Sequence, residues 1–378
     1  MIFNKSGKVL KGYNFSFEEQ SLELVSEYKY LGIIFKPSGS FSFAINYLSK
    51  KASKAMFCIR KTLYSEKLNA LLHPRLFDAC VKPILLYCSE IWSLDILIKR
   101  NLNFESKYDS FVPNKTQIKF AKFVLGVHKS ATNIAVLSEL GLFPLSLCTI
   151  KATINYWLHL LSANANSLIY HSYQENTLRK DGLCSKIKLL LAEIGFTHVW
   201  VNQGTFSKSK LLHSLSIKLE DRYINHWKKL LFNDDNKNGG NKLRTYRKLK
   251  NSYKMEKFLH SDVDKFALSI FVKIRISNSN LNIERGRYIK LPVEKRICPL
   301  CNIEPEDEIH FILKCPKLDE CRKELFSNIS SVVPSFNDMD EFQKFKFILS
   351  SNDLDICKIC ILGVNKLYSI NQDLKGKL

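Results

Sequence analysis

Apolar residues recur every three or four positions over most of the chain, which is the spacing of one face of an α-helix. The clearest case covers residues 41–63, where Ser40 is placed to cap the first turn. Residues 22–35 differ, because β-branched and aromatic side chains surround Gly32 and end at a Pro-Ser-Gly turn. We therefore expect a mainly α protein with a short N-terminal β-hairpin.

Proline and glycine residues mark the ends of further helices. The expected ranges are 69–92, with a kink or break at its prolines, 115–126, 134–141, 144–161, 212–230, 338–350 and 353–370. The two most apolar runs, 76–98 and 143–163, contain charged side chains, so we interpret them as buried helices and not as membrane spans.

The order of these patterns predicts consecutive regions. They are a β-hairpin region (1–36), a helical domain (37–163), a polar linker (164–182), a basic helical region (183–290), a zinc knuckle (291–326) and C-terminal helices (327–378). The first residues lack the apolar segment of a secretory signal, so we expect an intracellular protein, nuclear or cytoplasmic. Eleven cysteines, an odd number, fit metal ligands and free thiols better than a disulfide framework.

Four residues follow the pattern C-x2-C-x8-H-x4-C, namely Cys298, Cys301, His310 and Cys315. This spacing is typical of a small zinc knuckle, in which Cys and His fill all four corners of a tetrahedron and leave no position for a catalytic water. We predict one structural zinc ion at these residues. The alternative is a set of ordinary buried thiols, because free cysteine is commonly buried. We interpret Cys321, Cys357 and Cys360 as packing residues.

The chain carries 57 Lys and Arg residues against 36 Asp and Glu, a net charge of +21. Such an excess favours a polyanionic partner, although a lysine-rich surface without function is the alternative. Fifteen basic and five acidic residues lie between Lys242 and Arg296, with aromatic residues among them. Because cations neutralise phosphates and aromatic faces stack on unpaired bases, we expect nucleic acid as the partner, with no membrane and no small-molecule substrate.

The aromatic residues of this region divide into two groups. Phe266 shares a helical stripe with Ile270 and is expected in the core, whereas Tyr246, Tyr253 and Tyr288 are the stacking candidates.

Two groups of cations are the candidate phosphate contacts. Lys50, Lys54 and Lys61 project from the polar face of the N-terminal helix, which is either a solvated face or one that follows phosphates. The contacts predicted in the basic region are Arg244, Arg247, Lys248, Lys250, Arg285, Arg287 and Arg296. The acidic pair Asp234-Asp235 lies in a polar loop without strands to hold two carboxylates on metal, so no catalytic residue is predicted.

Several segments resemble, in collinear order, the region that follows the catalytic palm in non-LTR, LINE-type retrotransposon reverse transcriptases. They are 27–33 (EYKYLGI), 51–55 (KASKA), 81–92 (VKPILLYCSEIW), 139–145 (ELGLFPL), 275–277 (RIS), 283–288 (IERGRY) and 306–311 (EDEIHF). With the knuckle they span about residues 1–325.

The resemblance implies a role for each part. Tyr30, Leu31 and Gly32 would belong to the primer-grip end of the palm, the helices after them would form the thumb, and the knuckle would contact nucleic acid. The family's fingers and most of its palm, with the Asp-Asp hairpin that binds two catalytic metal ions, are absent from this chain.

The expected function is therefore a non-catalytic, nucleic-acid-binding C-terminal portion of such a polymerase, with an RNA template, primed DNA or a hybrid duplex as partner. One alternative is an inert or domesticated remnant. Another is part of an active RNA-directed DNA polymerase whose palm is encoded upstream. A third is nuclease or residual polymerase activity in the chain itself.

Overall fold

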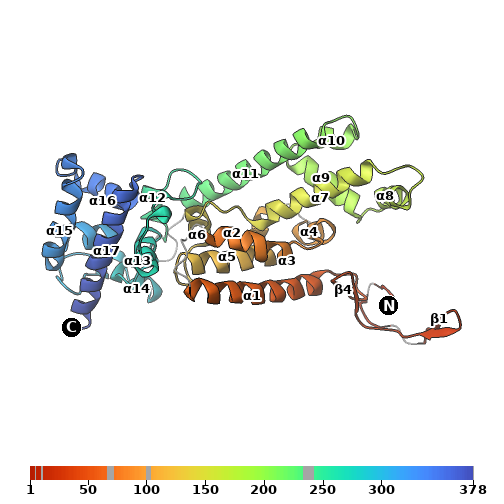
Figure 1. Ribbon diagram of the computed structural model, residues 1–378, viewed down its shortest axis with the longest axis horizontal. Helices are drawn as coiled ribbons and strands as arrows, with labels where there is room; N and C mark the ends of the chain where they lie inside the picture. The colour runs from red at the N-terminus through yellow and green to blue at the C-terminus, as the bar shows by residue number, and fades with distance from the viewer. Residues whose placement is uncertain (5, 10–11, 66–71, 99–103, 233–241, 378) are drawn as a thin grey trace. The chain divides into compact units, whose positions relative to one another are not determined.

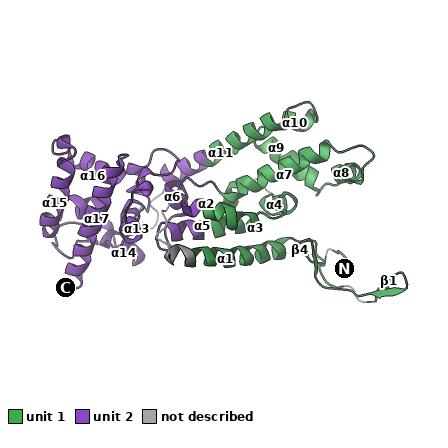
Figure 2. Cartoon of the chain, in the orientation of Figure 1, with its two compact units in different colours: residues 1–66, 75–117, 144–223 green, residues 67–74, 118–143, 224–378 purple. Residues whose placement is uncertain are grey.

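The computed structural model describes residues 1–378 apart from 5, 10–11, 66–71, 99–103, 233–241 and 378 (Figure 1). Helices hold 63% of the residues and strands 5%, which confirms the predicted mainly α fold with a short N-terminal β region. The chain forms two compact units (Figure 2). Unit 1 contains Met1–Glu66, Arg75–Gln117 and Pro144–Tyr223, and unit 2 contains Lys67–Pro74, Ile118–Phe143 and Ile224–Leu378.

The N-terminal β region consists of two separate antiparallel hairpins. They are β1 (Phe15–Phe17) with β2 (Gln20–Leu22), and β3 (Tyr28–Tyr30) with β4 (Ile33–Phe35). The second hairpin is the one predicted within 22–35, and its strands pair in the register Tyr30 to Ile33. The first was not predicted, because three-residue strands with all side chains exposed give no pattern of burial to detect.

The helices that lie wholly or partly in unit 1 are α1 (Ser42–Ser65), α2 (Leu72–Cys80), α3 (Lys82–Leu85), α4 (Ser89–Leu97), η1 (Phe104–Lys107), α5 (Val112–Val124), α7 (Leu145–Leu161), α8 (Leu168–Leu178), α9 (Leu183–Glu193), α10 (Thr197–Val201) and α11 (Lys208–Phe232). Of these, α1 to α5, α7 and α11 overlap predicted ranges, whereas η1, α8, α9 and α10 were not predicted. Pro83 lies in the first turn of α3, where the predicted break falls. The predicted cap of α1 forms as well, because the Ser40 hydroxyl accepts a hydrogen bond from the backbone N–H of Ser42 at 3.3 Å.

Unit 1 is held together by helices that lie far apart in the sequence. Helix α4 packs on α7, where Trp92 and Trp157 are both fully buried. The Trp157 ring stacks on Trp200 of α10 with ring centroids 5.5 Å apart. This packing explains the two apolar runs as buried helices, and none of the described helices is long and apolar enough to cross a membrane.

The predicted linker over 164–182 is wrong. Its central residues form helix α8, which begins at Ser167, whose hydroxyl accepts a hydrogen bond from the N–H of Tyr170. Only Tyr173 of this helix is buried, so the sequence shows no apolar stripe there. The chain also does not divide at this point, because 144–223 lies entirely in unit 1.

Unit 2 contains the C-terminal elements and α6. They are α6 (Asn133–Glu139), α12 (Tyr246–Leu249), η2 (Lys257–His260), α13 (Lys265–Arg275), α14 (Asn282–Tyr288), η3 (Val293–Lys295), η4 (His310–Lys314), η5 (Pro316–Leu318), α15 (Asp319–Ser330), η6 (Pro334–Phe336), α16 (Glu341–Ser350) and α17 (Leu354–Lys375). Helix α17 packs on α13, α15 and α16. Cys321, Cys357 and Cys360 are buried, as expected for packing residues. The acidic pair Asp234-Asp235 lies outside the described residues.

A fully buried ion pair joins two segments of unit 2. The Arg275 guanidinium donates to both carboxylate oxygens of Glu139 at 3.0 and 3.1 Å, and both side chains have no exposed surface. Arg275 also lies 3.2 Å from the carboxylate of Glu256 and 4.7 Å from the centre of the Phe258 ring. Because a buried charge is costly without a partner, these contacts fix α13 against the end of α6.

Glu256 completes this network. Its carboxylate pairs with the buried ammonium of Lys250. Burial opposes the charged form of Glu256, but the neighbouring cations Arg275 and Lys250 outweigh it and lower the pKa of the carboxyl below its usual value. Two carboxylates and two cations therefore balance inside the unit.

The Arg275→Met substitution is expected to destabilise unit 2 by about 3–5 kcal/mol, because it leaves the Glu139 carboxylate buried without a cation. The double substitution Arg275→Met and Glu139→Met should recover much of that loss. Urea unfolding followed by circular dichroism measures both, with Arg285→Met, an exposed arginine of α14, as the control. A double variant no more stable than the single one would contradict the pairing.

Glu256 makes the stability of unit 2 sensitive to acid. Its pKa is lower in the folded than in the unfolded chain, so its contribution is present above about pH 4.5 and is lost as the pH falls further. The Glu256→Gln variant should be less stable at pH 7, and the free energy of unfolding should fall less steeply below pH 4.5 than in the wild type. Parallel slopes for the two proteins would exclude this role.

Candidate metal centre and nucleic-acid interface

The first two knuckle cysteines lie on a tight turn in unit 2. The N–H of Cys298 donates to the carbonyl of Glu304 at 2.9 Å, and the N–H of Asn302 donates to the carbonyl of Cys298 at 2.9 Å. Asn302 has the left-handed conformation, with φ of 56°. Asparagine tolerates that conformation better than most residues. The turn reverses the chain just after Cys301 and leads it back toward the remaining ligands.

The other two ligands lie at the ends of a single π-helical turn, η4. The N–H of Cys315 closes this turn on the carbonyl of His310 at 2.9 Å. At its start the carboxylate of Asp307 accepts from the N–H of His310 at 2.7 Å. Glu304 lies 2.8 Å from Nδ1 of His310, so the opposite ring nitrogen, Nε2, is left to face the cysteines.

The four predicted ligands converge on one point. One ligand atom from each of Cys298, Cys301, His310 and Cys315 lies within 4.8 Å of all the others. The sulfurs of Cys298 and Cys315 are 3.9 Å apart, and the sulfur of Cys301 is 3.4 Å from Nε2 of His310. Tetrahedral zinc with bonds of about 2.0–2.3 Å places such atoms about 3.5–3.8 Å apart. The donor set and its spacing therefore fit one zinc ion with all four positions filled by protein.

The electrostatics of the cluster explain why a metal ion would compete with protons there. A hydrogen bond with Cys315, and then burial, raise the pKa of the Cys298 thiol to about 12, whereas the same hydrogen bond lowers the pKa of Cys315. Burial disfavours the charged imidazole, but hydrogen bonds to Cys298 and Glu304 raise the pKa of His310 to about 9. A metal ion binding here must displace these protons.

The predicted contacts in unit 1 lie on the surface. Lys50, Lys54 and Lys61 are exposed on α1, on the side opposite its buried stripe. Tyr30 and Leu31 are 56% and 72% exposed at the turn between β3 and β4.

Gly32 at the same turn has φ of +87°, and a Cβ there would lie 3.2 Å from the Tyr87 ring. The Tyr87 hydroxyl donates to the carbonyl of Leu31 at 2.6 Å. The turn is therefore fixed to α3 and α4 through one tyrosine while its own side chains face outward.

Three predicted phosphate contacts are instead interior groups. Lys250 is 2% exposed and pairs with Glu256, and Arg296 is 2% exposed and donates to backbone carbonyls, including Ile283 at 2.9 Å. Arg244 pairs with two carboxylates, Glu284 and Glu308, each at 2.6 Å. The partners of Arg244 lie 40 and 64 residues away, and those of Lys250 and Arg296 lie within 13 residues. The basic run alone shows neither these contacts nor the burial of Lys250 and Arg296. We correct the prediction at these positions.

The other cations of the basic region lie nearer the surface. Lys248 and Arg285 are exposed, and Arg247 and Arg287 are half-buried. Arg287 pairs with Glu284 at 2.6 Å.

The three stacking candidates differ in exposure. Tyr288 is 63% exposed, but Tyr246 is fully buried, and half-buried Tyr253 packs against the rings of Phe143 and Trp227. Phe266, expected in the core, is 62% exposed because it lies in the first turn of α13, before the stripe turns inward. Tyr288 is thus the stacking candidate that the structure leaves accessible.

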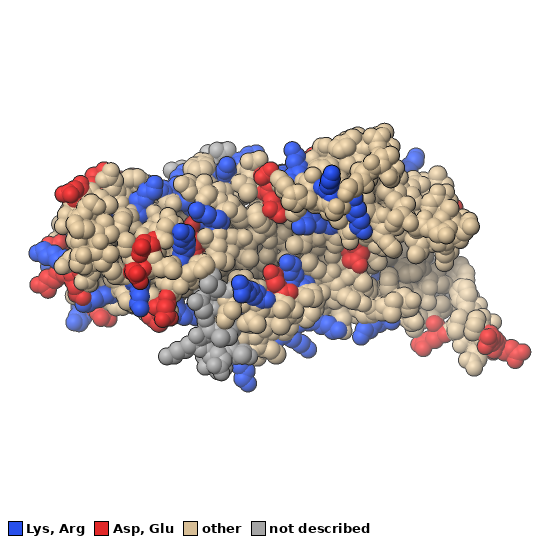
Figure 3. All heavy atoms as spheres, turned by 45° about the horizontal axis from the view of Figure 1, so that its top comes forward, with Lys and Arg blue, Asp and Glu red and all other residues tan. Residues whose placement is uncertain are grey.

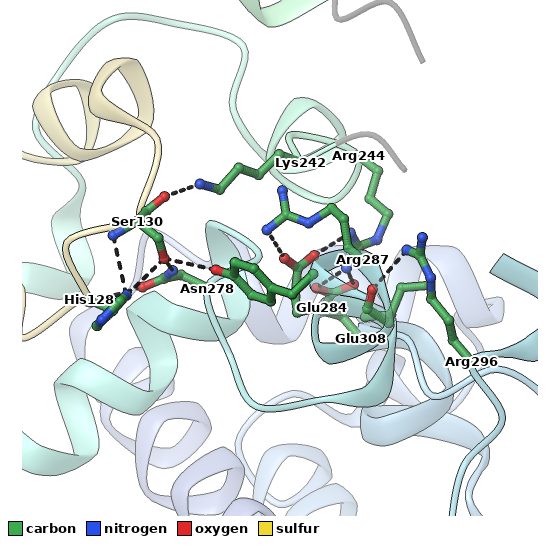
Figure 4. A network of polar contacts seen from close by, with 11 residues as sticks. His128, Ser130, Lys242, Arg244, Asn278, Glu284, Arg287, Arg296 and Glu308 are labelled. Atoms are coloured by element: carbon green, nitrogen blue, oxygen red, sulfur yellow. Dashed lines mark hydrogen bonds and ion pairs between the residues drawn. The ribbon is translucent and has the colours of Figure 1, made fainter. Parts of the chain in front are cut away.

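A polar network that sequence reasoning missed holds Tyr288 in place (Figure 4). The Ser130 hydroxyl accepts hydrogen bonds from the Tyr288 hydroxyl at 2.9 Å and from the amide of Asn278 at 3.2 Å. The ammonium of Lys242 donates to the Ser130 carbonyl. Ser130 and Asn278 lie 148 residues apart, and no spacing within the basic region points to either.

Cations gather around this network. Burial, and then the charges of Arg287 and Lys122, lower the pKa of Lys242. Arg287 also lies 5.3 Å from the centre of the Tyr288 ring. Glu284 offsets part of this charge, because it pairs with Arg287 and opposes the fall in the pKa of Lys242. Cations next to an exposed aromatic face are an arrangement that suits a phosphate-bearing ligand.

Basic side chains elsewhere are spread out. On the face drawn in Figure 3, lysine and arginine side chains outnumber acidic ones and are distributed over the surface without forming a single dense patch. An exposed ring beside a cation also occurs at Phe43, where the Lys36 ammonium lies 4.4 Å from the ring centre. The Tyr288 region differs because its hydroxyl is also fixed by a hydrogen bond to Ser130.

Purified protein is expected to contain one zinc ion, and Cys315→Ser should lose it because three ligands hold zinc far more weakly than four. Cys321→Ser, which changes a buried thiol six residues away, should keep the metal. Elemental analysis and limited proteolysis test both, with cleavage near residues 298–318 appearing in Cys315→Ser only. Wild-type protein without zinc, or equal zinc loss in both variants, would refute the ligand set.

No protein-family model, no curated protein and no solved structure matches the chain. The resemblance to LINE-type reverse transcriptases therefore depends on the segments quoted from the sequence. The geometry of the cysteine-histidine cluster and of the Tyr288 network is independent of that resemblance.

Proposed function

We propose that this chain binds nucleic acid through a basic region that zinc stabilises, and that it is the non-catalytic C-terminal portion of a non-LTR retrotransposon-type reverse transcriptase. The main observation in support of nucleic-acid binding is the environment of the Tyr288 side chain. Its ring is 63% exposed, its hydroxyl is fixed by Ser130, and the guanidinium of Arg287 lies 5.3 Å from the ring centre. A ring held in place loses little freedom when a base stacks on it.

The cations give such a surface affinity without sequence readout. With a net charge of +21, the chain attracts phosphates from a distance. Exposed Lys248 and Arg285 and half-buried Arg287 lie in the same unit as Tyr288. Phosphate contacts of this kind position a strand, whereas stacking is tolerant of base identity.

The knuckle has a supporting role in this proposal. Four protein ligands fill a tetrahedral zinc site, so zinc would have no open position to activate water. The residues that follow Cys301 return to α14, where the N–H of Ile283 donates to the carbonyl of Glu306 at 3.2 Å. Zinc would thus fix the segment that packs against the helix carrying Tyr288.

Contacts among the resembling segments support the proposed family. Glu139 of 139–145 pairs with Arg275 of 275–277, and Tyr87 of 81–92 bonds to Leu31 of 27–33. Glu284 of 283–288 and Glu308 of 306–311 share the cation Arg244. Within each unit, segments that resemble one family in collinear order therefore also contact one another.

The Tyr288→Ala variant should bind a single-stranded oligonucleotide about 5- to 100-fold more weakly, because one base loses its stacking partner. Tyr288→Phe should retain most of the affinity, since it keeps the ring and loses only the bond to Ser130. Fluorescence anisotropy at low salt measures the binding, with Phe342→Ala, an exposed aromatic of α16, as the control.

If Tyr288→Ala and the wild type bind the oligonucleotide with equal affinity, the proposed stacking of a base on Tyr288 is contradicted. Binding to a primed RNA template no stronger than to a generic duplex would favour an inert remnant instead.

A further inference from the structure

A cavity with a volume of about 410 Å³ lies beside α14 in unit 2. Its lining includes Arg285, Ile289, Leu291, Lys295, Arg296 and Pro299. Pro299 belongs to the turn between the first two knuckle cysteines, so the predicted zinc site shapes one wall. The volume falls within the range of about 300–1,000 Å³ that is usual for small-molecule sites.

The charge of this cavity is one-sided. Four of its lining residues are cations, Arg285, Lys295, Arg296 and Lys375, and none is acidic. Lys375 pairs with Glu306 at 2.6 Å, outside the lining. Arg285 and Lys295 are exposed at the edge of the cavity, on α14 and η3. An anion entering the cavity would meet both.

Arg296 adds a buried positive charge to the lining of the cavity. It is buried, and its guanidinium donates to the carbonyls of Leu291 and Ile283, which are neutral acceptors. Gly286 leaves room for the Arg296 side chain to pack against α14, because a Cβ there would lie 2.6 Å from Cγ of Arg296.

Apart from Asn282, the rest of the lining has no polar side chain. Ile289 is 70% exposed, and Leu291 and Pro299 are half-buried. Such side chains offer a surface to a sugar or a base, and they give no advantage to a bare phosphate ion. A base held in a duplex is stacked on both sides, so only an unpaired nucleotide would reach them.

We propose that this cavity binds one nucleotide of a single-stranded nucleic acid, with its phosphate at Arg285 and Lys295 above Arg296 and its sugar and base against Ile289 and Pro299. The inference depends on the proposed nucleic-acid-binding function and adds a specific subsite to it. Stacking on Tyr288, at the end of the same helix, is a separate contact.

The test uses isothermal titration of the full zinc-loaded chain at low salt with three probes: thymidine 5′-monophosphate, thymidine and inorganic phosphate. The nucleotide is expected to bind, thymidine to give no detectable binding, and phosphate to bind at least about 3-fold more weakly than the nucleotide. Arg285→Glu and Lys295→Glu should each weaken nucleotide binding at least about 10-fold, because each replaces an attraction by a repulsion.

Lys358→Glu, an exposed lysine of α17, makes the same charge change away from the cavity and should have little effect. Zinc content and circular dichroism verify that every variant is folded. Nucleotide binding that is unchanged in both cavity variants overturns the inference. So does phosphate binding as tight as that of the nucleotide, because the apolar wall would then contribute nothing.

An oligothymidine titrated in parallel separates this inference from the proposed function. If the oligomer binds but the nucleotide neither binds nor competes with it, the cavity is excluded and nucleic-acid binding stands. If the nucleotide binds but the oligomer does not, both are contradicted, because the cavity would then serve free nucleotides.

Discussion

A charge that leaves water needs an opposite charge nearby, and this requirement decides where the basic residues of unit 2 lie. Arg275 is completely buried against Glu139, Lys250 is buried against Glu256, and half-buried Arg244 pairs with the buried carboxylates of Glu284 and Glu308. These pairs connect α6, α12, α13, α14 and the knuckle into one unit. Only the cations left over after this pairing remain for a partner.

A single helix can carry both a residue of a buried ion pair and a cation that is exposed to solvent. On α14, Glu284 faces inward and binds Arg244, whereas Arg285 is exposed and lines the cavity. Tyr288 ends the same helix with its ring outward and its hydroxyl fixed by Ser130. One short helix thus joins the structural network to the surfaces that we propose for binding.

Much of the fold could be predicted from periodicity, because burial of an apolar stripe is a local property of the sequence. Helix α7 begins directly after Pro144, as its sequence indicates, and α1 follows its stripe from Ser42. Helix α8 could not be predicted in this way, since it buries one side chain and is held by its neighbours α7 and α9. The four metal ligands could be predicted because their spacing along the chain is itself the signal.

The nucleic-acid contacts were less predictable, because a cation on the surface and one in a buried pair look alike in sequence. Arg244 finds its partner Glu308 64 residues away, and Tyr288 finds Ser130 158 residues away. Only the folded chain shows that Arg244 is structural while Lys242, at the very edge of the basic run, lies beside Tyr288 and its cations. The nucleic-acid contacts therefore depend on the cations that remain on the surface and not on the total charge of the chain.

Binding by displayed cations has one direct signature, the release of counterions from the nucleic acid. The measurement is the affinity of the zinc-loaded chain for a single-stranded oligonucleotide over a series of salt concentrations. The account predicts that the logarithm of the binding constant falls linearly with the logarithm of salt concentration, with a slope of about −0.7 for each phosphate neutralised. A binding constant that does not change with salt would contradict it.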